Sequence, residues 1–239
     1  MSHSRVDTAV EELQRRIIEG HYPSGSALPG EEALAADLNI SRLTAREATR
    51  VLATRGVLYV KQGSGTYVNS PDLWQDLGSL VALATHEGSP QEVGLKLLEA
   101  RRMLEVGSAG LAAARISAER LALMEATVED LRAADAAGDV EAAVRADLAF
   151  HDHIIEAAGN PFIRLIFAPL RDELIAARRV TSSHHEVRAH AIAQHERIVT
   201  AMRMGSPDAA KAAMRAHMDQ TSNDLLEFGT ASSPTSTSH

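Results

Sequence analysis

Four side chains that can bind a metal lie on apolar faces of predicted helices: Asp147, His151, His195 and His217. The first two are four residues apart in the stretch 140–158, so both point the same way. An ionised aspartate among apolar groups costs free energy unless it has a partner. Taken singly, each histidine is typical of a satisfied core residue. Together, imidazole and carboxylate groups predict a divalent metal site, with zinc as the first candidate and nickel, iron or manganese as alternatives.

A row of arginines marks a second kind of chemistry, and it consists of Arg42, Arg46 and Arg50, with Thr44 near them. Their spacing of four places them along one face of a predicted helix over 41–55. An arginine can bind guanine O6 and N7 in the major groove through two hydrogen bonds. Such a row alone is typical of a solvated helix face. A shorter predicted helix over 31–38 precedes it after a brief turn, however, which is the order of a helix-turn-helix.

A hairpin follows this pair of helices. Residues 57–60 and 66–68 are mostly β-branched or aromatic, and Gly63-Ser64-Gly65 forms the turn between them. Lys61 and Gln62 stand at the tip beside Gly63, whose missing Cβ lets the backbone approach DNA closely. Helices followed by a glycine-tipped hairpin predict a winged helix-turn-helix that binds double-stranded DNA.

The rest of the chain reads as helices only, so the predicted fold class is mainly α. Asn160-Pro161 and Ser206-Pro207 each place a capping residue before proline, which is a strong signal for a helix start. Trp74 is expected to pack between the domains. The predicted domains are a DNA-binding domain over 1–69, a linker over 70–78, an antiparallel all-helical effector, metal and dimerisation domain over 79–228, and a disordered tail over 229–239.

Composition restricts the function classes. The chain has 239 residues and a net charge of −8. It contains no cysteine, which excludes disulfides and thiolate chemistry. Residues 1–70 are close to neutral and the acidic excess falls on 71–239, so contact with DNA is expected from the first part. No apolar run is long enough to span a membrane and no signal peptide precedes the helices, so a cytoplasmic location is expected.

The segment LPGEEALAADLNISRLTAREATRVLATRGVLYVKQGSGTYV resembles the DNA-binding domain of the GntR superfamily of bacterial regulators, over about residues 6–69. The resemblance implies that Arg42 and Arg46 contact bases or phosphates, and that Gln62 and Gly63 reach the minor groove. Glu32 departs from the pattern, because many relatives carry a DNA-contacting arginine there. A carboxylate repels phosphate and can accept from cytosine instead.

Residues 76–228 resemble the FCD ligand-sensing domain of the fatty-acid-regulator branch of the same superfamily. The matching motifs are Asp147-Leu-Ala-Phe-His151 with Gly159-Asn160-Pro161, and Glu99-Ala-Arg101 with Glu105. The resemblance implies an antiparallel helical bundle that binds small carboxylates, often at a metal held by the four residues above. Arg101 is a candidate for pairing with an effector carboxylate, and an ion pair with Glu105 one turn later is the alternative.

Together these observations predict that the chain is a transcription regulator, and the family resemblance favours a repressor. Its affinity for operator DNA is expected to respond to a small organic acid bound at or near the metal. A homodimer is expected, because one DNA-binding domain covers only half of a palindromic operator. In one alternative the metal itself is the signal. In another the chain is a metalloenzyme joined to a DNA-binding domain, but no general base and no G-x-S-x-G nucleophile motif supports it. We therefore expect no enzymatic activity and no membrane partner.

Overall fold

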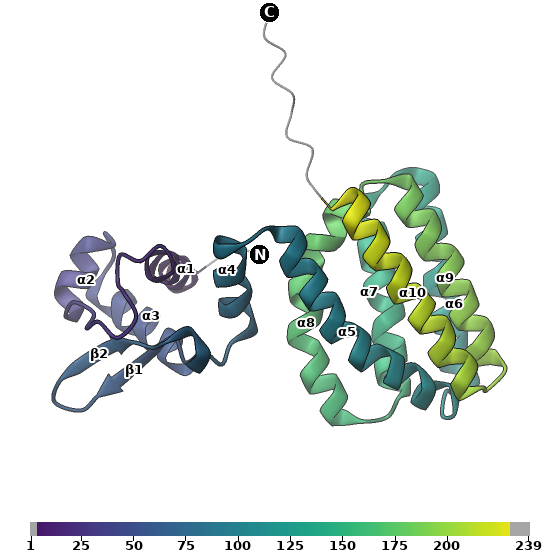
Figure 1. The fold of residues 1–239 in the computed structure, drawn as a ribbon, viewed down its shortest axis with the longest axis horizontal. Coiled ribbons are helices and arrows are strands. Elements are labelled where there is room, and N and C mark those ends of the chain that lie inside the picture. The colour runs from purple at the N-terminus through teal and green to yellow at the C-terminus, as the bar shows by residue number, and fades with distance from the viewer. Residues whose placement is uncertain (1–3, 230–239) are drawn as a thin grey trace, which may run out of the picture. The chain divides into compact units, whose positions relative to one another are not determined.

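The computed structural model describes residues 4–229, apart from the side chains of residues 172 and 176. The chain divides into two compact units, Met1–Ser89 and Pro90–His239 (Figure 1). The first combines helices with a two-stranded sheet, and the second is a bundle of helices. The predicted fold class, a winged helix-turn-helix followed by an all-helical bundle, is confirmed. Of the predicted disordered tail, residues 230–239 lie outside the described part.

The N-terminal unit contains these elements: α1 (Arg5–Ile18), α2 (Glu31–Asp37), α3 (Arg42–Thr54), β1 (Leu58–Lys61), β2 (Gly65–Val68), a 3₁₀ turn (Pro71–Leu73) and α4 (Leu77–Glu87). Helix α3 begins after Ser41, whose hydroxyl accepts from the backbone N–H of Thr44. The strands pair antiparallel, with Lys61 opposite Gly65. Gly63 has a φ of +74°, which glycine adopts at little cost, so the turn is local and tight.

The apolar core of the N-terminal unit takes one face from each of its helices and one side of the hairpin. Leu13, Leu34, Leu52 and Leu58 are all buried in it, and each such side chain contributes about 2 kcal/mol of transfer free energy. Trp74 belongs to the same core and is 6% exposed. Its predicted place between the domains was therefore wrong.

Helix α4 packs on α1, so the compact units divide after Ser89. The sequence instead places a linker over 70–78 and begins the second domain at residue 79. Ser79 is buried, and its hydroxyl lies 3.1 Å from Oε1 of Gln14 in α1. This contact joins segments that are far apart in the chain, so local sequence signals do not show it.

As far as residue 229, the C-terminal unit is a bundle of six helices: α5 (Pro90–Ala113), α6 (Ala118–Ala137), α7 (Val140–Ala157), α8 (Pro161–Thr181), α9 (His185–Arg203) and α10 (Pro207–Phe228). The expected caps are present, since Asn160 accepts from the backbone N–H of Phe162 and Ser206 from that of Ala209. Helix α7 contacts α5, α8 and α9, and α10 lies along α5 and α9. Among the described residues, no helix combines the length and the apolarity that crossing a bilayer requires.

Candidate functional site

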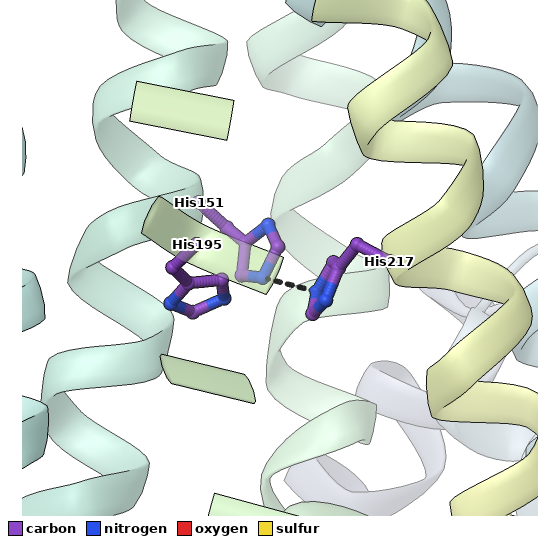
Figure 2. Close-up of side chains that lie close together, drawn as sticks. All are labelled: His151, His195 and His217. Atoms are coloured by element: carbon purple, nitrogen blue, oxygen red, sulfur yellow. Dashed lines mark hydrogen bonds between the residues drawn. The ribbon is translucent and has the colours of Figure 1, made fainter. Parts of the chain in front are cut away.

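Three histidine side chains from three helices meet inside the C-terminal unit (Figure 2). His151 comes from α7, His195 from α9 and His217 from α10, and all three are buried. One ring nitrogen of each lies within 4.8 Å of the other two. The Nε2 atoms of His151 and His217 are 3.3 Å apart. The structure thus brings together the three histidines that the helical periodicity placed on inward faces.

Asp147 lies beside this cluster, one turn before His151. Its Oδ1 atom is 3.4 Å from Nε2 of His195 and 3.7 Å from Nε2 of His151. Its other oxygen accepts from Nε of Arg178 at 2.5 Å. Burial opposes ionisation of Asp147, but the charge of Arg178 and the adjacent imidazoles outweigh it and hold the pKa of this carboxyl well below its usual range. The aspartate is therefore ionised, with one oxygen directed at the histidines.

Two of the three imidazoles, those of His195 and His217, have lowered pKa values and are neutral at physiological pH. Burial lowers the pKa of His195 to about 3, and the nearby positive charges act in the same direction against the attraction of Asp147. Burial and its neighbouring histidines also hold the pKa of His217 well below its ordinary value. The ring of Phe150 stacks on that of His195 with centroids 3.8 Å apart, which fixes the plane of the imidazole. Neutral, oriented imidazoles are the form that binds metal ions.

Within the described part of the chain, several ring nitrogens of the cluster have no hydrogen-bond partner. They include both nitrogens of His195 and Nδ1 of His217. Buried polar atoms are almost always paired in folded proteins, because leaving one unpaired costs about 1–3 kcal/mol. Three imidazoles and one carboxylate also form a donor set that divalent ions accept. The residues present therefore fit a metal.

Arg101 is already engaged by the protein. Its Nε atom pairs with Glu105, the alternative that the sequence left open, and Nη2 lies 2.7 Å from Nε2 of His151. Glu105 also contacts Nδ1 of His151. Burial opposes ionisation of Glu105, but the charge of Arg101 and the contact with His151 lower the pKa of this carboxyl to about 2. Arg101 thus orients a histidine of the cluster, and it also lines the adjacent cavity.

That cavity has a volume of about 70 Å³ and reaches Asp147 and His217. Its wall includes Arg178, a buried residue that the sequence analysis missed. Burial, and next the charge of Arg101, lower the pKa of Arg178 to about 10, which leaves the guanidinium charged at neutral pH. A signal for it exists, because Leu170 and Leu174 precede it at spacings of four and are buried on the same face of α8.

The predicted DNA-reading residues lie on exposed parts of α3 and of the hairpin. The side chains of Arg42 and Arg46 are 66% and 52% exposed, and both contact Glu31 of α2. Arg46 makes two bonds of 2.7 Å to that carboxylate, and these bonds, aided by Arg42 and opposed by slight burial, lower the pKa of Glu31 to about 2. Arg50 is exposed, and its side chain has no partner among the described residues. The three arginines are therefore accessible to a ligand such as DNA, and contacts with Glu31 hold the first two in place.

Other residues of this surface have different surroundings. Thr44 is half-buried at the start of α3, where its hydroxyl lies 2.7 Å from that of Ser41. Lys61, Gln62 and Gly63 form the exposed tip of the hairpin. Leu43, which the sequence analysis missed, is 66% exposed beside Arg42. An exposed apolar side chain at the start of a recognition helix suits contact with a thymine methyl group.

Comparisons with known proteins identify a family for the N-terminal part of the chain and a domain for the C-terminal part. Residues 5–68 match the model of bacterial regulatory proteins of the gntR family, and residues 96–220 match the FCD domain. The HTH-type transcriptional repressor NanR of Salmonella arizonae is 30% identical over 233 residues, which cover 94% of this chain and 86% of the repressor. The NanR repressor of Escherichia coli K12 is also 30% identical, over 92% of this chain and 83% of its own length.

Solved structures give the same result. A GntR protein of Streptococcus agalactiae is 31% identical, with a TM-score of 0.50 over 91% of this chain and 99% of that one. Lar, which controls the expression of the Listeria monocytogenes agr system, has a TM-score of 0.65 over 95% of this chain and 99% of its own. At 17% identity, the second likeness concerns the fold alone.

Proposed function

Because this chain belongs to the GntR family of bacterial regulatory proteins and carries an FCD domain, we propose that it represses transcription and that a small carboxylate, bound at or near a divalent metal, controls its affinity for operator DNA. Membership of the family makes it a DNA-binding transcription regulator. The observation that carries the rest of the proposal is the cluster of three buried histidines beside Asp147 and a cavity.

The metal is supported by the chemistry of its surroundings. We infer that it is held by Asp147, His151, His195 and His217. The lowered pKa values of His195 and His217 favour neutral imidazoles, some ring nitrogens have no partner among the described residues, and the carboxylate is ionised. Zinc is the first candidate, and nickel, iron and manganese accept the same donors. When bound, such an ion supplies concentrated positive charge that favours a carboxylate nearby.

The DNA-reading surface supports the other half of the proposal. Exposed Arg42, Arg46 and Arg50 on α3, with Lys61 and Gln62 at the hairpin tip, suit a helix in the major groove and a wing on the adjacent backbone or minor groove. Similarity to proteins named as repressors, over most of their length, favours repression. We propose a cytoplasmic location, because the proposed partner is operator DNA.

We further propose that the protein acts as a homodimer, since one DNA-binding domain covers only one half-site of an operator. Helix α8 offers a surface for this contact, because Phe162 and Leu165 are each 73% exposed and Ile166 is 57% exposed. A two-fold axis through such an apolar patch sets like residues against each other. Leu165→Glu should lower the dimer fraction in analytical ultracentrifugation, whereas Leu123→Glu, at an exposed leucine of α6, should not. An unchanged dimer would show that α8 has no such role.

One observation favours a second candidate function, in which the metal is itself the signal. Nη2 of Arg101 lies 2.7 Å from Nε2 of His151. The Nε2 atom can therefore either accept a hydrogen bond from Arg101 or bind an ion. Metal binding would then require the Arg101 side chain to move. We propose no enzymatic activity, because the relatives with this combination of domains are regulators.

Operator binding separates these candidates. A DNA fragment selected by the protein from a random library is titrated by fluorescence anisotropy with protein stripped by a chelator, reloaded with zinc, or reloaded and mixed with acetate or glycolate. The proposed function predicts that the dissociation constant changes at least ten-fold when the carboxylate is added to the zinc form only. A change on adding zinc alone would support the metal as signal. An affinity that no addition alters would refute both.

A further inference from the structure

The cavity beside the histidine cluster carries information about the effector. Its wall is formed by α5, α6, α7, α8, α9 and α10, and three arginines line it: Arg101, Arg178 and Arg188. Arginine binds carboxylates in a bidentate manner through its two outer nitrogens. Which of the three can bind a ligand depends on what each of them already contacts.

Two of the three are occupied by the protein. Arg101 pairs with Glu105 and contacts His151. Arg188 donates from Nε to Oδ1 of Asp135 at 2.7 Å and from Nη1 to the carbonyl of Ser182, also at 2.7 Å. These contacts use the guanidinium groups to hold helices together, so neither presents a free pair of nitrogens to the cavity.

Arg178 differs from both. It pairs with Asp147 through Nε, and neither Nη1 nor Nη2 has a partner within the described part of the chain. Its side chain is only 9% exposed, so bulk water does not solvate these two groups freely. A buried guanidinium with two unpaired N–H groups is costly unless an anion completes it.

We propose that Arg178 binds the carboxylate of the effector through Nη1 and Nη2, and this inference rests on the proposed function for the existence of an effector. The same guanidinium holds Asp147 through Nε, and Asp147 lies beside His195 and His151. Arg178 therefore links the effector directly to a proposed metal ligand. Arg101 is a positioning residue for His151 rather than the effector contact expected from the sequence.

Residues of α10 in the same wall restrict the rest of the ligand. It includes Asp224, which is 4% exposed, together with Gln220 and Thr221. Asp224 accepts hydrogen bonds from His190 at 2.9 Å and from Gln220 at 3.0 Å. A second carboxylate would be repelled there, whereas a hydroxyl or ammonium group could donate to the aspartate.

Size restricts the ligand further. The volume of about 70 Å³ is well below the roughly 150 Å³ cavity that accommodates benzene. Without movement of the walls, the part of the ligand that the cavity encloses is therefore smaller than benzene. The effector class is thus a short monocarboxylate that carries a hydrogen-bond donor, rather than a dicarboxylate or a fatty acid.

Calorimetric titration of the full chain with acetate, glycolate and malonate tests this assignment. Each variant is compared at equal zinc content, measured by elemental mass spectrometry. Arg178→Lys keeps a charge beside Asp147 but removes the two-nitrogen fork, and it should weaken glycolate binding at least ten-fold. Arg179→Lys, at the exposed neighbour that pairs with Glu141, should leave it unchanged. Malonate should bind wild type at least ten-fold more weakly than glycolate, and Asp224→Asn should narrow that gap.

Wild-type affinity for glycolate in the Arg178→Lys variant would overturn the assignment, and so would the absence of binding by all three acids at millimolar concentration. Malonate as tight as glycolate would overturn the monocarboxylate class. Operator affinity in the same samples separates this inference from the proposed function. Binding that depends on Arg178 but leaves operator affinity unchanged contradicts the proposed function alone. An operator response to glycolate that persists in Arg178→Lys contradicts the inference alone.

Discussion

Arg101 donates from its guanidinium to Nε2 of His151 at 2.7 Å, in a part of the bundle where both side chains are buried. Because Nε2 accepts this bond, the ring proton lies on Nδ1, where it faces Glu105. The three side chains form a closed group, since Arg101 also pairs with Glu105. This group fixes the orientation of one proposed metal ligand before any ion is bound.

The first prediction concerns the stability of that group. Arg101→Met should lower the free energy of unfolding by about 3–5 kcal/mol, because it leaves the buried carboxylate of Glu105 without its cation. Arg102→Met is the matched control, since the next residue of α5 pairs with Asp219 at the surface and should cost less than about 1 kcal/mol. Urea denaturation followed by circular dichroism measures both. Equal losses in the two variants would show that the buried pair has no special weight.

The second prediction concerns metal content. Protein purified without added metal and then exposed to zinc should hold close to one ion per chain, measured by elemental mass spectrometry. His195→Ala should lose most of it, because His195 belongs to the cluster and neither of its ring nitrogens has a hydrogen-bond partner within the described residues. His153→Ala is the control, since that ring lies on α7 beside Arg120, outside the cluster. Zinc retained by His195→Ala, or lost equally by both variants, would rule out the proposed ligand set.

The third prediction is a loss of stability in mild acid. Burial lowers the pKa of His195 to about 3 and that of His217 well below its ordinary value, while in the unfolded chain both titrate near 6.5. Their folded pKa is depressed, so their contribution is complete above about pH 6.5 and is lost as the pH falls toward 3. In that window the unfolded state binds protons that the folded state does not. Below the unfolded pKa, each histidine should therefore lower the free energy of unfolding by about 1.4 kcal/mol for every unit by which the pH falls.

Denaturation of metal-free protein at a series of pH values between 7.5 and 5 measures this slope. His195→Gln should make it shallower, because one of the two buried imidazoles is gone. His86→Gln, at an exposed position of α4, should leave the slope as in wild type. If wild-type stability is flat over this range, the two rings are not held neutral by the fold.

Much of the fold can be predicted from the sequence because the decisive signals are local. Asn160 before Pro161 and Ser206 before Pro207 act within one turn of the helices that they begin, and the structure confirms both. The assignment of α4 to the N-terminal unit depends instead on contacts such as that between Ser79 and Gln14. Nothing near Ser79 in the chain indicates that partner.

The candidate site divides in the same way. The inward positions of the three histidines follow from the helical period, so they can be found from spacing alone. The partners of the charged side chains cannot be found from spacing, because they depend on how the helices pack. Arg178 follows two buried leucines at spacings of four, yet its pairing with Asp147 depends on how α8 lies on α7. For the same reason, the choice of Arg101 between Glu105 and an effector stays open at the level of sequence.

The last prediction concerns the DNA-reading surface. Arg46 is held by two bonds to Glu31 and is exposed, so its guanidinium is oriented before DNA arrives. Arg46→Ala should weaken binding to the selected operator. If Arg46 contacts a phosphate, affinity should fall uniformly across sequences and the dependence of log K on log salt should become shallower by about one. If it contacts a base, the loss should be about 1–3 kcal/mol and confined to one position of the operator.

Arg55→Ala, directly after the last residue of α3, provides the control. Arg55 caps the other end of α3 and faces Gln14 and Asp76 within the N-terminal unit. Recognition helices contact bases mainly through their first residues, so this variant should bind within about two-fold of wild type. Fluorescence anisotropy at several salt concentrations distinguishes all three results. Weaker binding by Arg55→Ala than by Arg46→Ala would mean that the far end of α3 reads the DNA, and the arginine row would lose its assigned role.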